Sequence, residues 1–203
     1  MKTLILLSAA VLSAAGVLTF ATAQDKPAPG TKPPTGQAEM MAKWSAFSTP
    51  GEAHERLAKL AGKWNLDVKM TDPEMPASTS EATSECRMIM DDRYLEETVH
   101  GTFADMPFEG FGLTGYDNLK EKYCGTWVDN MSTGFMSSEG TYDAATKTFT
   151  YVTDCPDVVA GKYIKARMVM KQIDDDRWMM QAFKPGAGGK EVMTMQIDYE
   201  RAR

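Results

Sequence analysis

Methionine recurs at alternate positions in three short stretches of the sequence, and this spacing is the first feature that could support chemistry. The stretches are CRMIMDD, KARMVMKQI and EVMTMQI, and the pairs are Met88 and Met90, Met168 and Met170, and Met193 and Met195. In a β-strand, residues i and i+2 point to the same face, so each pair would present two thioethers side by side. Thioethers are soft ligands that select Cu(I), so copper handling is one interpretation.

Two other interpretations of the methionines remain open beside the copper site. The flexible thioether fills irregular gaps, so the pairs can be core residues of a closed barrel. Methionine also suits surfaces that repack around varied apolar molecules, so the pairs can line a ligand cavity. The opposite strand face carries charged or polar residues in all three stretches, namely Glu85 and Arg87, then Lys165, Arg167 and Lys171, then Thr194, Gln196 and Asp198. We therefore expect the methionine face to point inward and the charged face to point to water.

Few other residues form patterns typical of catalysis. In WVDNMSTG, Trp127 and Asp129 would share a strand face and could orient a ligand, although the favoured interpretation is that Asp129 with Asn130 caps the turn to Gly134. Glu96 and Glu97 are adjacent and point to opposite faces, so they cannot act as a carboxylate pair. His100 shares its parity with polar residues and is a weak candidate for a haem ligand. We expect no cofactor; an acid–base enzyme using Asp129, Glu96 or His100 is the alternative.

The N-terminal segment predicts export. Residues 1–23 contain Lys2, an apolar run and a small-x-small ending at Ala21 and Ala23, which is typical of a cleaved secretory signal peptide. The proline-rich residues 24–39 predict a disordered linker, and residues 40–203 remain for one folded domain. We expect a periplasmic or extracellular protein without a stable membrane anchor.

The folded region changes from one helix to a long series of strands. STPGEAHERLAKLAGKW predicts a helix with Thr49 as N-cap and an apolar stripe at Leu57, Leu60 and Ala61. After Gly62 the hydrophobic period is two, and short turns rich in Asp, Asn and Gly separate the strands. We predict ten strands, near 63–71, 79–90, 93–102, 108–117, 122–129, 133–142, 147–154, 162–173, 176–184 and 190–200.

Consecutive hairpins favour an all-β, up-and-down antiparallel barrel of about ten strands, because closure removes the exposed edges of an open sheet. The short N-terminal helix would lie across one end of the barrel. A β-sandwich is the alternative fold. A barrel of this size can enclose a small ligand.

The charge pattern limits the partners of the protein. The net charge is −6, and basic residues form no continuous run. Nucleic acid is therefore not an expected partner. The spacing of Cys86, Cys124 and Cys155 matches no zinc site, and their expected positions in the barrel are too far apart for a disulfide.

Three blocks of the sequence resemble the bacterial family known as domain of unknown function 1579. These blocks are TPGEAHERLAKLAGKW, MPFEGFGLTGYDNLKEKY and TWVDNMSTGFMSSEGTYDAATKTFT. The resemblance extends from about Trp44 to Arg201 and implies a lipocalin-like barrel. Gly62-Lys63-Trp64 also resembles the Gly-x-Trp that opens the first strand of calycin barrels. The family implies no catalytic residue. The expectation is an exported barrel that binds or carries a small apolar molecule.

Overall fold

The computed structural model describes residues 35–158 and 160–203. The predicted signal segment, with Ala21 and Ala23, and residues 24–34 of the predicted linker lie outside the described residues. Within the described part, the elements follow in the order α1 (Thr35–Ser48), α2 (Glu52–Ala58), β1 (Gly62–Met70), β2 (Ser78–Ile89), β3 (Tyr94–Phe103), β4 (Met106–Asp117), β5 (Lys122–Asp129), β6 (Met136–Asp143), β7 (Thr148–Asp157), β8 (Lys162–Gln172), β9 (Arg177–Pro185), a 3-10 turn (Ala187–Gly189) and β10 (Glu191–Arg201).

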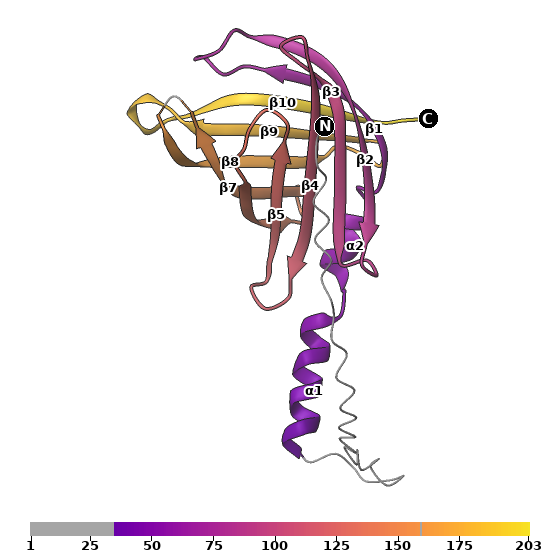
Figure 1. Cartoon of the computed structure of the whole chain (residues 1–203). Helices are drawn as coiled ribbons and strands as arrows, with labels where there is room; N and C mark the ends of the chain where they lie inside the picture. The colour runs from indigo at the N-terminus through magenta and orange to yellow at the C-terminus, as the bar shows by residue number, and fades with distance from the viewer. Residues whose placement is uncertain (1–34, 159) are drawn as a thin grey trace, which may run out of the picture.

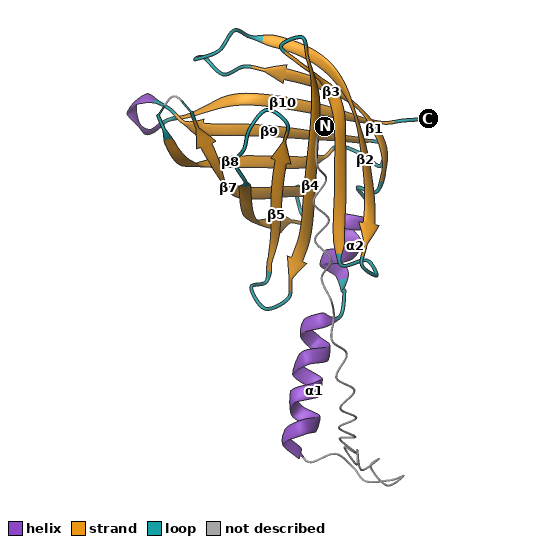
Figure 2. Cartoon of the chain, in the orientation of Figure 1, coloured by secondary structure: helices purple, strands orange, loops and turns teal. Residues whose placement is uncertain are grey.

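The strands form one closed antiparallel barrel (Figures 1 and 2). Each strand pairs with the next along the chain, and β1 pairs with β10 to close the sheet. The prediction of an all-β up-and-down barrel with about ten strands is confirmed, and the β-sandwich alternative is not adopted. Closure leaves every strand paired on both sides, so the barrel has no free edge.

Alternation of side chains explains which face of each strand is buried. In β1, Trp64 and Leu66 are buried whereas Asn65 and Asp67 are exposed. Since the side-chain period of a strand is two, one face of the sheet points into the barrel and the other to solvent. The turn between β2 and β3 has positive φ at Met90, Asp91 and Asp92, and short polar side chains such as Asp tolerate that conformation.

Helix α2 closes one end of the barrel, as the sequence predicted (Figure 1). Leu57 and Leu60 are buried against the core, and the Trp64 indole N–H donates to the Leu60 carbonyl at 2.9 Å. The Tyr123 hydroxyl donates to the Ala53 carbonyl at 3.3 Å. The first hydrogen bond fixes the turn between α2 and β1, and the second joins the helix to β5.

The predicted N-cap of this helix is wrong. Gly51, not Thr49, is the N-cap, because the ring of His54 turns back and its Nδ1 accepts the Gly51 N–H at 3.1 Å. Thr49 instead ends α1, where its hydroxyl donates to the Ser45 carbonyl at 2.7 Å. His54 thus takes the N3 position of a capping box, where its imidazole accepts the N–H of the N-cap residue.

Helix α1 begins inside the segment predicted to be linker and projects away from the barrel (Figure 1). Residues 35–39, which the sequence assigned to the disordered linker, form its first turn. Asn118 anchors its end, since the side-chain amide lies 3.0 Å from the Phe47 carbonyl and 2.9 Å from the Thr49 carbonyl. Among the described residues, neither helix has the length and hydrophobicity needed to cross a membrane.

Candidate functional site

The half of the barrel next to α2 is a closed aromatic core. Its inner face is buried and includes Trp64, Tyr123, Phe149, Tyr151 and Trp178. Tyr123 and Phe149 meet edge to face with ring centroids 4.9 Å apart, and Arg56 of α2 covers the ring of Tyr142 at 5.1 Å. Such packing leaves little space for a ligand at this end.

The inner face becomes more accessible toward the opposite end, which we call the mouth. The mouth is formed by the ends of the odd-numbered strands and the starts of the even-numbered strands. Inner-face side chains in this half are only partly buried, and they include Val68, Met70, Trp127, Asp129, Met136, Ile164, Met168 and Met195. Mouth-side inner residues with accessible surface are what a barrel that admits a small molecule requires.

Trp127 forms part of the wall near the mouth. Its indole lies over two glycines of β4, since a methyl group on Gly110 would lie 2.7 Å from Trp127 Cη2 and one on Gly112 would lie 3.1 Å from Trp127 Cε3. The glycines of GFGLTG thus allow close approach of the large ring. The indole N–H donates to Asp129 Oδ2 at 3.0 Å.

Asp129 caps the turn after β5, which is the role that the sequence favoured, and it also contacts Trp127. Its Oδ1 accepts the Met131 N–H at 3.0 Å and so caps the turn after β5, while Oδ2 holds the Trp127 ring. The structure therefore brings Trp127 and Asp129 together on the inner face. Their part in binding a ligand stays a prediction.

Glu97 places a carboxylate on the inner face. It lies between Leu95 and Val99, which are both 6% exposed, yet Glu97 keeps some accessible surface. Ser84 Oγ donates to Glu97 Oε1 at 2.7 Å, and the Tyr199 hydroxyl is a second partner of this carboxylate. Burial raises the pKa of Glu97 above its ordinary value of 4.5, while the hydrogen bonds from Ser84 and Tyr199 act in the opposite direction.

Glu97 and Trp127 are neighbours inside the barrel. A methyl group on Gly112, between them, would lie 3.7 Å from Glu97 Cβ and 3.1 Å from Trp127 Cε3. The carboxylate and the aromatic ring are thus held on one part of the inner face by three adjacent strands, β3, β4 and β5. A carboxylate beside an aromatic ring is an arrangement that can recognise a polar or cationic group.

The cysteines are free thiols. Cys86 lies on the inner face with its Sγ 3.5 Å from Ser84 Oγ. Burial, followed by the negative charge of Glu97, raises the pKa of the Cys86 thiol to about 12. Because the thiolate is the reactive form, Cys86 is a packing residue and a poor nucleophile.

Four of the six paired methionines point inward as predicted. Met88, Met168, Met170 and Met195 pack against the buried core. Met168 and Met170 pair with Tyr151 and Phe149, whose rings are buried, so β8 presents both thioethers to the interior. Their contact with a ligand stays a prediction.

The inward orientation predicted for Met193 is wrong because β10 contains a bulge. Met193 pairs with Phe183 and Met195 pairs with Ala182, with the register shift between them. Phe183 and Ala182 are consecutive and face opposite sides, so the two methionines do as well. Phe183 lies on the outer wall, 4.1 Å beneath the guanidinium of Arg167.

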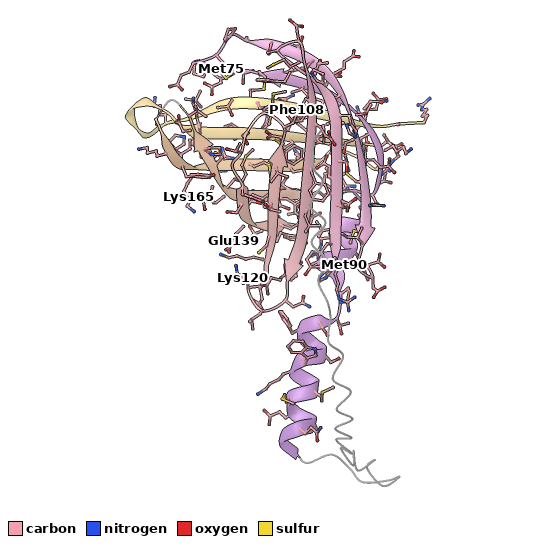
Figure 3. The ribbon with its side chains drawn as sticks, in the orientation of Figure 1. Met75, Met90, Phe108, Lys120, Glu139 and Lys165 are labelled. Atoms are coloured by element: carbon pink, nitrogen blue, oxygen red, sulfur yellow. The ribbon has the colours of Figure 1, made fainter. Side chains whose placement is uncertain are left out.

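The inward orientation predicted for Met90 is also wrong. Strand β2 ends at Ile89, and Met90 lies in the following turn with φ 52° and 66% of its surface exposed. Figure 3 shows it at the end of the barrel near α2, away from the mouth. Two of the three Met-x-Met pairs therefore do not present their thioethers together, and only β8 keeps the geometry required by the copper interpretation.

The residues proposed for the enzyme alternative are not brought together. Glu96 lies on the outer wall and pairs with Arg87 at 2.7 Å. His100 is exposed on the same outer face, which agrees with its polar neighbours and excludes it as a ligand inside the barrel. Of the three residues, only Asp129 lies on the inner face.

The sequence does not single out Glu97 as a site residue, because its pairing with Glu96 is excluded by their opposite orientations. A signal was present: Leu95 and Val99, at the i−2 and i+2 positions, are the apolar face of this strand. Ser84 lies on β2, which pairs directly with β3, but Tyr199 could not be assigned to Glu97 from the sequence, since β10 is separated from β3 along the chain and, around the barrel, by β1 and β2.

Two surface hollows lie outside the barrel interior. One, of about 620 Å³, follows α1 and includes Met40, Trp44, Phe47 and Leu119. The other, of about 420 Å³, lies by the outer faces of β1, β2, β3 and β10 and includes His100. We favour the interior as the site because it combines a buried carboxylate, an aromatic ring and apolar walls.

Comparison with known proteins agrees with this architecture. The structure is similar to that of Rv2717c from M. tuberculosis, with TM-score 0.56, 13% identity, and coverage of 76% of this chain and 100% of that one. It is also similar to the S-type phycobiliprotein lyase CPES from Guillardia theta, with TM-score 0.51, 10% identity, and coverage of 76% and 99%. At these identities the likeness shows a shared barrel fold.

A comparison with curated proteins finds no match. The family model described as a protein of unknown function, DUF1579, matches residues 49–201. This match spans the whole barrel and helix α2, so the chain belongs to the DUF1579 family.

Proposed function

We propose that this protein is exported and binds a small apolar molecule inside the mouth half of its barrel. The observation that supports this most strongly is the difference between the two halves of the inner face. Side chains next to α2 are buried, whereas the apolar inner side chains toward the mouth, including Met168 and Met195, keep accessible surface. A barrel interior that is filled at one end and accessible at the other is suited to hold one small ligand.

The polar groups of the interior support a ligand with at least one polar atom. On the inner face toward the mouth, Thr153 Oγ1 is buried and has no hydrogen-bond partner within the described residues. Buried polar atoms in folded proteins nearly always have a partner. A ligand that combines an apolar body with a polar group would satisfy such atoms and contact the methionines.

Export is supported by the sequence of residues 1–23 alone. Expression of the full chain in a bacterial host, followed by mass determination of the exported protein, tests it. A mature chain starting at Gln24 would support the proposal, and retention of residues 1–23 in the cytoplasm would overturn it.

Ligand binding is tested first with protein purified from its native compartment. Native mass spectrometry should show an additional mass of a few hundred daltons that organic solvent removes. Protein stripped in this way should then bind the neutral apolar dye Nile red with an increase in fluorescence. A stripped barrel that binds no apolar probe, and a native protein without bound mass, would overturn the proposal.

A matched pair of substitutions locates the dye. Met168→Gln places an amide on the inner face, whereas Met90→Gln makes the same change in the exposed turn. We expect the first to weaken Nile red binding several-fold and the second to leave it unchanged, because a buried amide without a partner opposes an apolar ligand. Equal effects of the two changes would place the dye elsewhere.

A further inference from the structure

The carboxylate of Glu97 has no cationic partner inside the barrel. Within the described residues, no ion pair includes Glu97, whereas its neighbour Glu96 pairs with Arg87 on the outer wall. Arg201, whose charge acts on Cys86, is held at the closed end by Asp176 and stacks on Trp64 at 4.2 Å. Lys184 near the mouth pairs with Asp72 at 2.8 Å. Each of these cations already has its own partner.

The groups that face Glu97 leave part of its hydrogen-bonding capacity free. Ser84 donates from β2 at 2.7 Å and Tyr199 interacts from β10, while Cys86 lies beside Ser84. None of these three side chains carries a positive charge. An ionised carboxylate has about four acceptor positions, so two donors leave room for further N–H donors.

The neighbouring surfaces favour a cation over an anion. The ring of Trp127 lies beside Glu97 across Gly112, and aromatic faces attract ammonium groups. The net charge of −6 attracts cations and repels anions before they enter. An anionic ligand such as a fatty acid carboxylate would instead meet a second carboxylate without a cation between them.

We propose that Glu97 is the recognition group for the protonated amine of a small apolar ligand. The apolar body of this ligand lies against the inner methionines, and its ammonium group pairs with Glu97 beside Trp127. This inference rests on the proposed function, because it names the chemical class of the molecule that the barrel binds.

The test compares three probes with the same apolar chain and different head groups: n-octylammonium, 1-octanol and octanoate. Stripped protein is titrated with each below its micelle concentration, and displacement of Nile red gives the affinities. We expect octylammonium to bind about tenfold or more tightly than octanol, as a charge-assisted hydrogen bond allows, and octanoate to bind most weakly.

The decisive comparison uses two adjacent carboxylates. Glu97→Gln and Glu96→Gln remove the same charge, one from the inner face and one from the outer wall. We expect Glu97→Gln to reduce the preference for octylammonium to about twofold or less while octanol still binds. Glu96→Gln should keep the wild-type preference. Equal affinities for octylammonium and octanol in the wild type, or equal losses in the two variants, would overturn the inference.

A pH titration of the wild type keeps the inference testable if Glu97→Gln does not fold. Octylammonium stays protonated in acid, so its affinity should fall toward that of octanol as Glu97 takes up a proton, while octanol binding stays constant. An amine preference that persists after the carboxylates are protonated would overturn the role of Glu97. Binding of octanol without any amine preference refutes only this inference, whereas failure of all three probes and of Nile red refutes the proposed function as well.

Discussion

The substitution Gly110→Ala tests the placement of Trp127 in the wall of the proposed site. The added methyl group would lie 2.7 Å from Trp127 Cη2 and 3.1 Å from Phe108 Cε1. Carbon atoms in contact are normally about 3.5–4.0 Å apart, so the indole must move by roughly an ångström. Its hydrogen bond to Asp129, 3.0 Å long, is then strained or lost.

The expected cost is that of overpacking at the buried position of Gly110, about 1–3 kcal/mol. For a domain of this size each kcal/mol corresponds to roughly 2–4 °C in Tm. Gly112→Ala is the graded control, because its methyl group would lie 3.1 Å from Trp127 Cε3 and 3.4 Å from Cζ3 and requires a smaller shift. Urea unfolding followed by far-ultraviolet circular dichroism gives the free energy of unfolding. Near-ultraviolet circular dichroism reports the environment of the indole ring in the folded protein.

A double-mutant cycle identifies the cause of the destabilisation. In a Trp127→Ala background, Gly110→Ala should cost at least about 1 kcal/mol less than in the wild type, since the clashing ring is gone. The reasoning is refuted if Gly110→Ala leaves the free energy of unfolding within about 0.5 kcal/mol of the wild type, or if its cost is the same with and without Trp127.

Three further predictions concern proton binding and the methionines. Burial raises the pKa of Glu97, so between about pH 4.5 and this raised pKa the folded protein keeps a proton that the unfolded chain loses. In that range wild-type stability should decrease with rising pH by up to about 1.4 kcal/mol per pH unit relative to Glu97→Gln, and it should level off once Glu97 is ionised in the folded state. Parallel dependences of the free energy of unfolding on pH in the two proteins would contradict this. Burial lowers the pKa of His54 below 6.5, so the stability that the neutral imidazole contributes is present at higher pH and is lost as pH falls below 6.5. A His54→Gln variant should lack this acid-sensitive component of stability in thermal melts from about pH 7 to 5. Met168→Ala should reduce the free energy of unfolding by about 2 kcal/mol and Met90→Ala by less than about 0.5, and similar losses measured by urea unfolding would show that the two side chains do not differ in burial.

The strands and most of their faces could be predicted from local sequence. Alternation in WNLDVKM placed Trp64 and Leu66 inside, and the short turns separated ten strands whose bounds agree with the structure within a few residues. Hydrophobic period and turn residues are local properties, and a half-buried strand cannot change face without exposing its apolar side chains. The position of α2 against one end also followed, because its apolar residues needed a surface to cover.

The ends of elements depended on contacts that the local pattern does not contain. Met90 continues the alternation of β2, but the strand ends one residue earlier because the tight turn to β3 begins there. Gly51 is the N-cap of α2 and His54 accepts its N–H, although the sequence offered Thr49 as the N-cap. In each case a competing local signal was present, and the geometry of the turn decided between them.

The sequence by itself determined a lipocalin-like series of ten strands, a helix at one end and an inward face rich in methionine. Only the tertiary structure decided that β10 has a bulge, because a bulge is defined by the partner strand, here by the pairing of Met193 with Phe183 and of Met195 with Ala182. Only the closed sheet brings Tyr199 of the last strand to Glu97 of the third. The alternation of side chains along a strand is a local property of the sequence. The grouping of a carboxylate with its partners arises instead from strand pairing between distant segments, and the candidate site depends on that grouping.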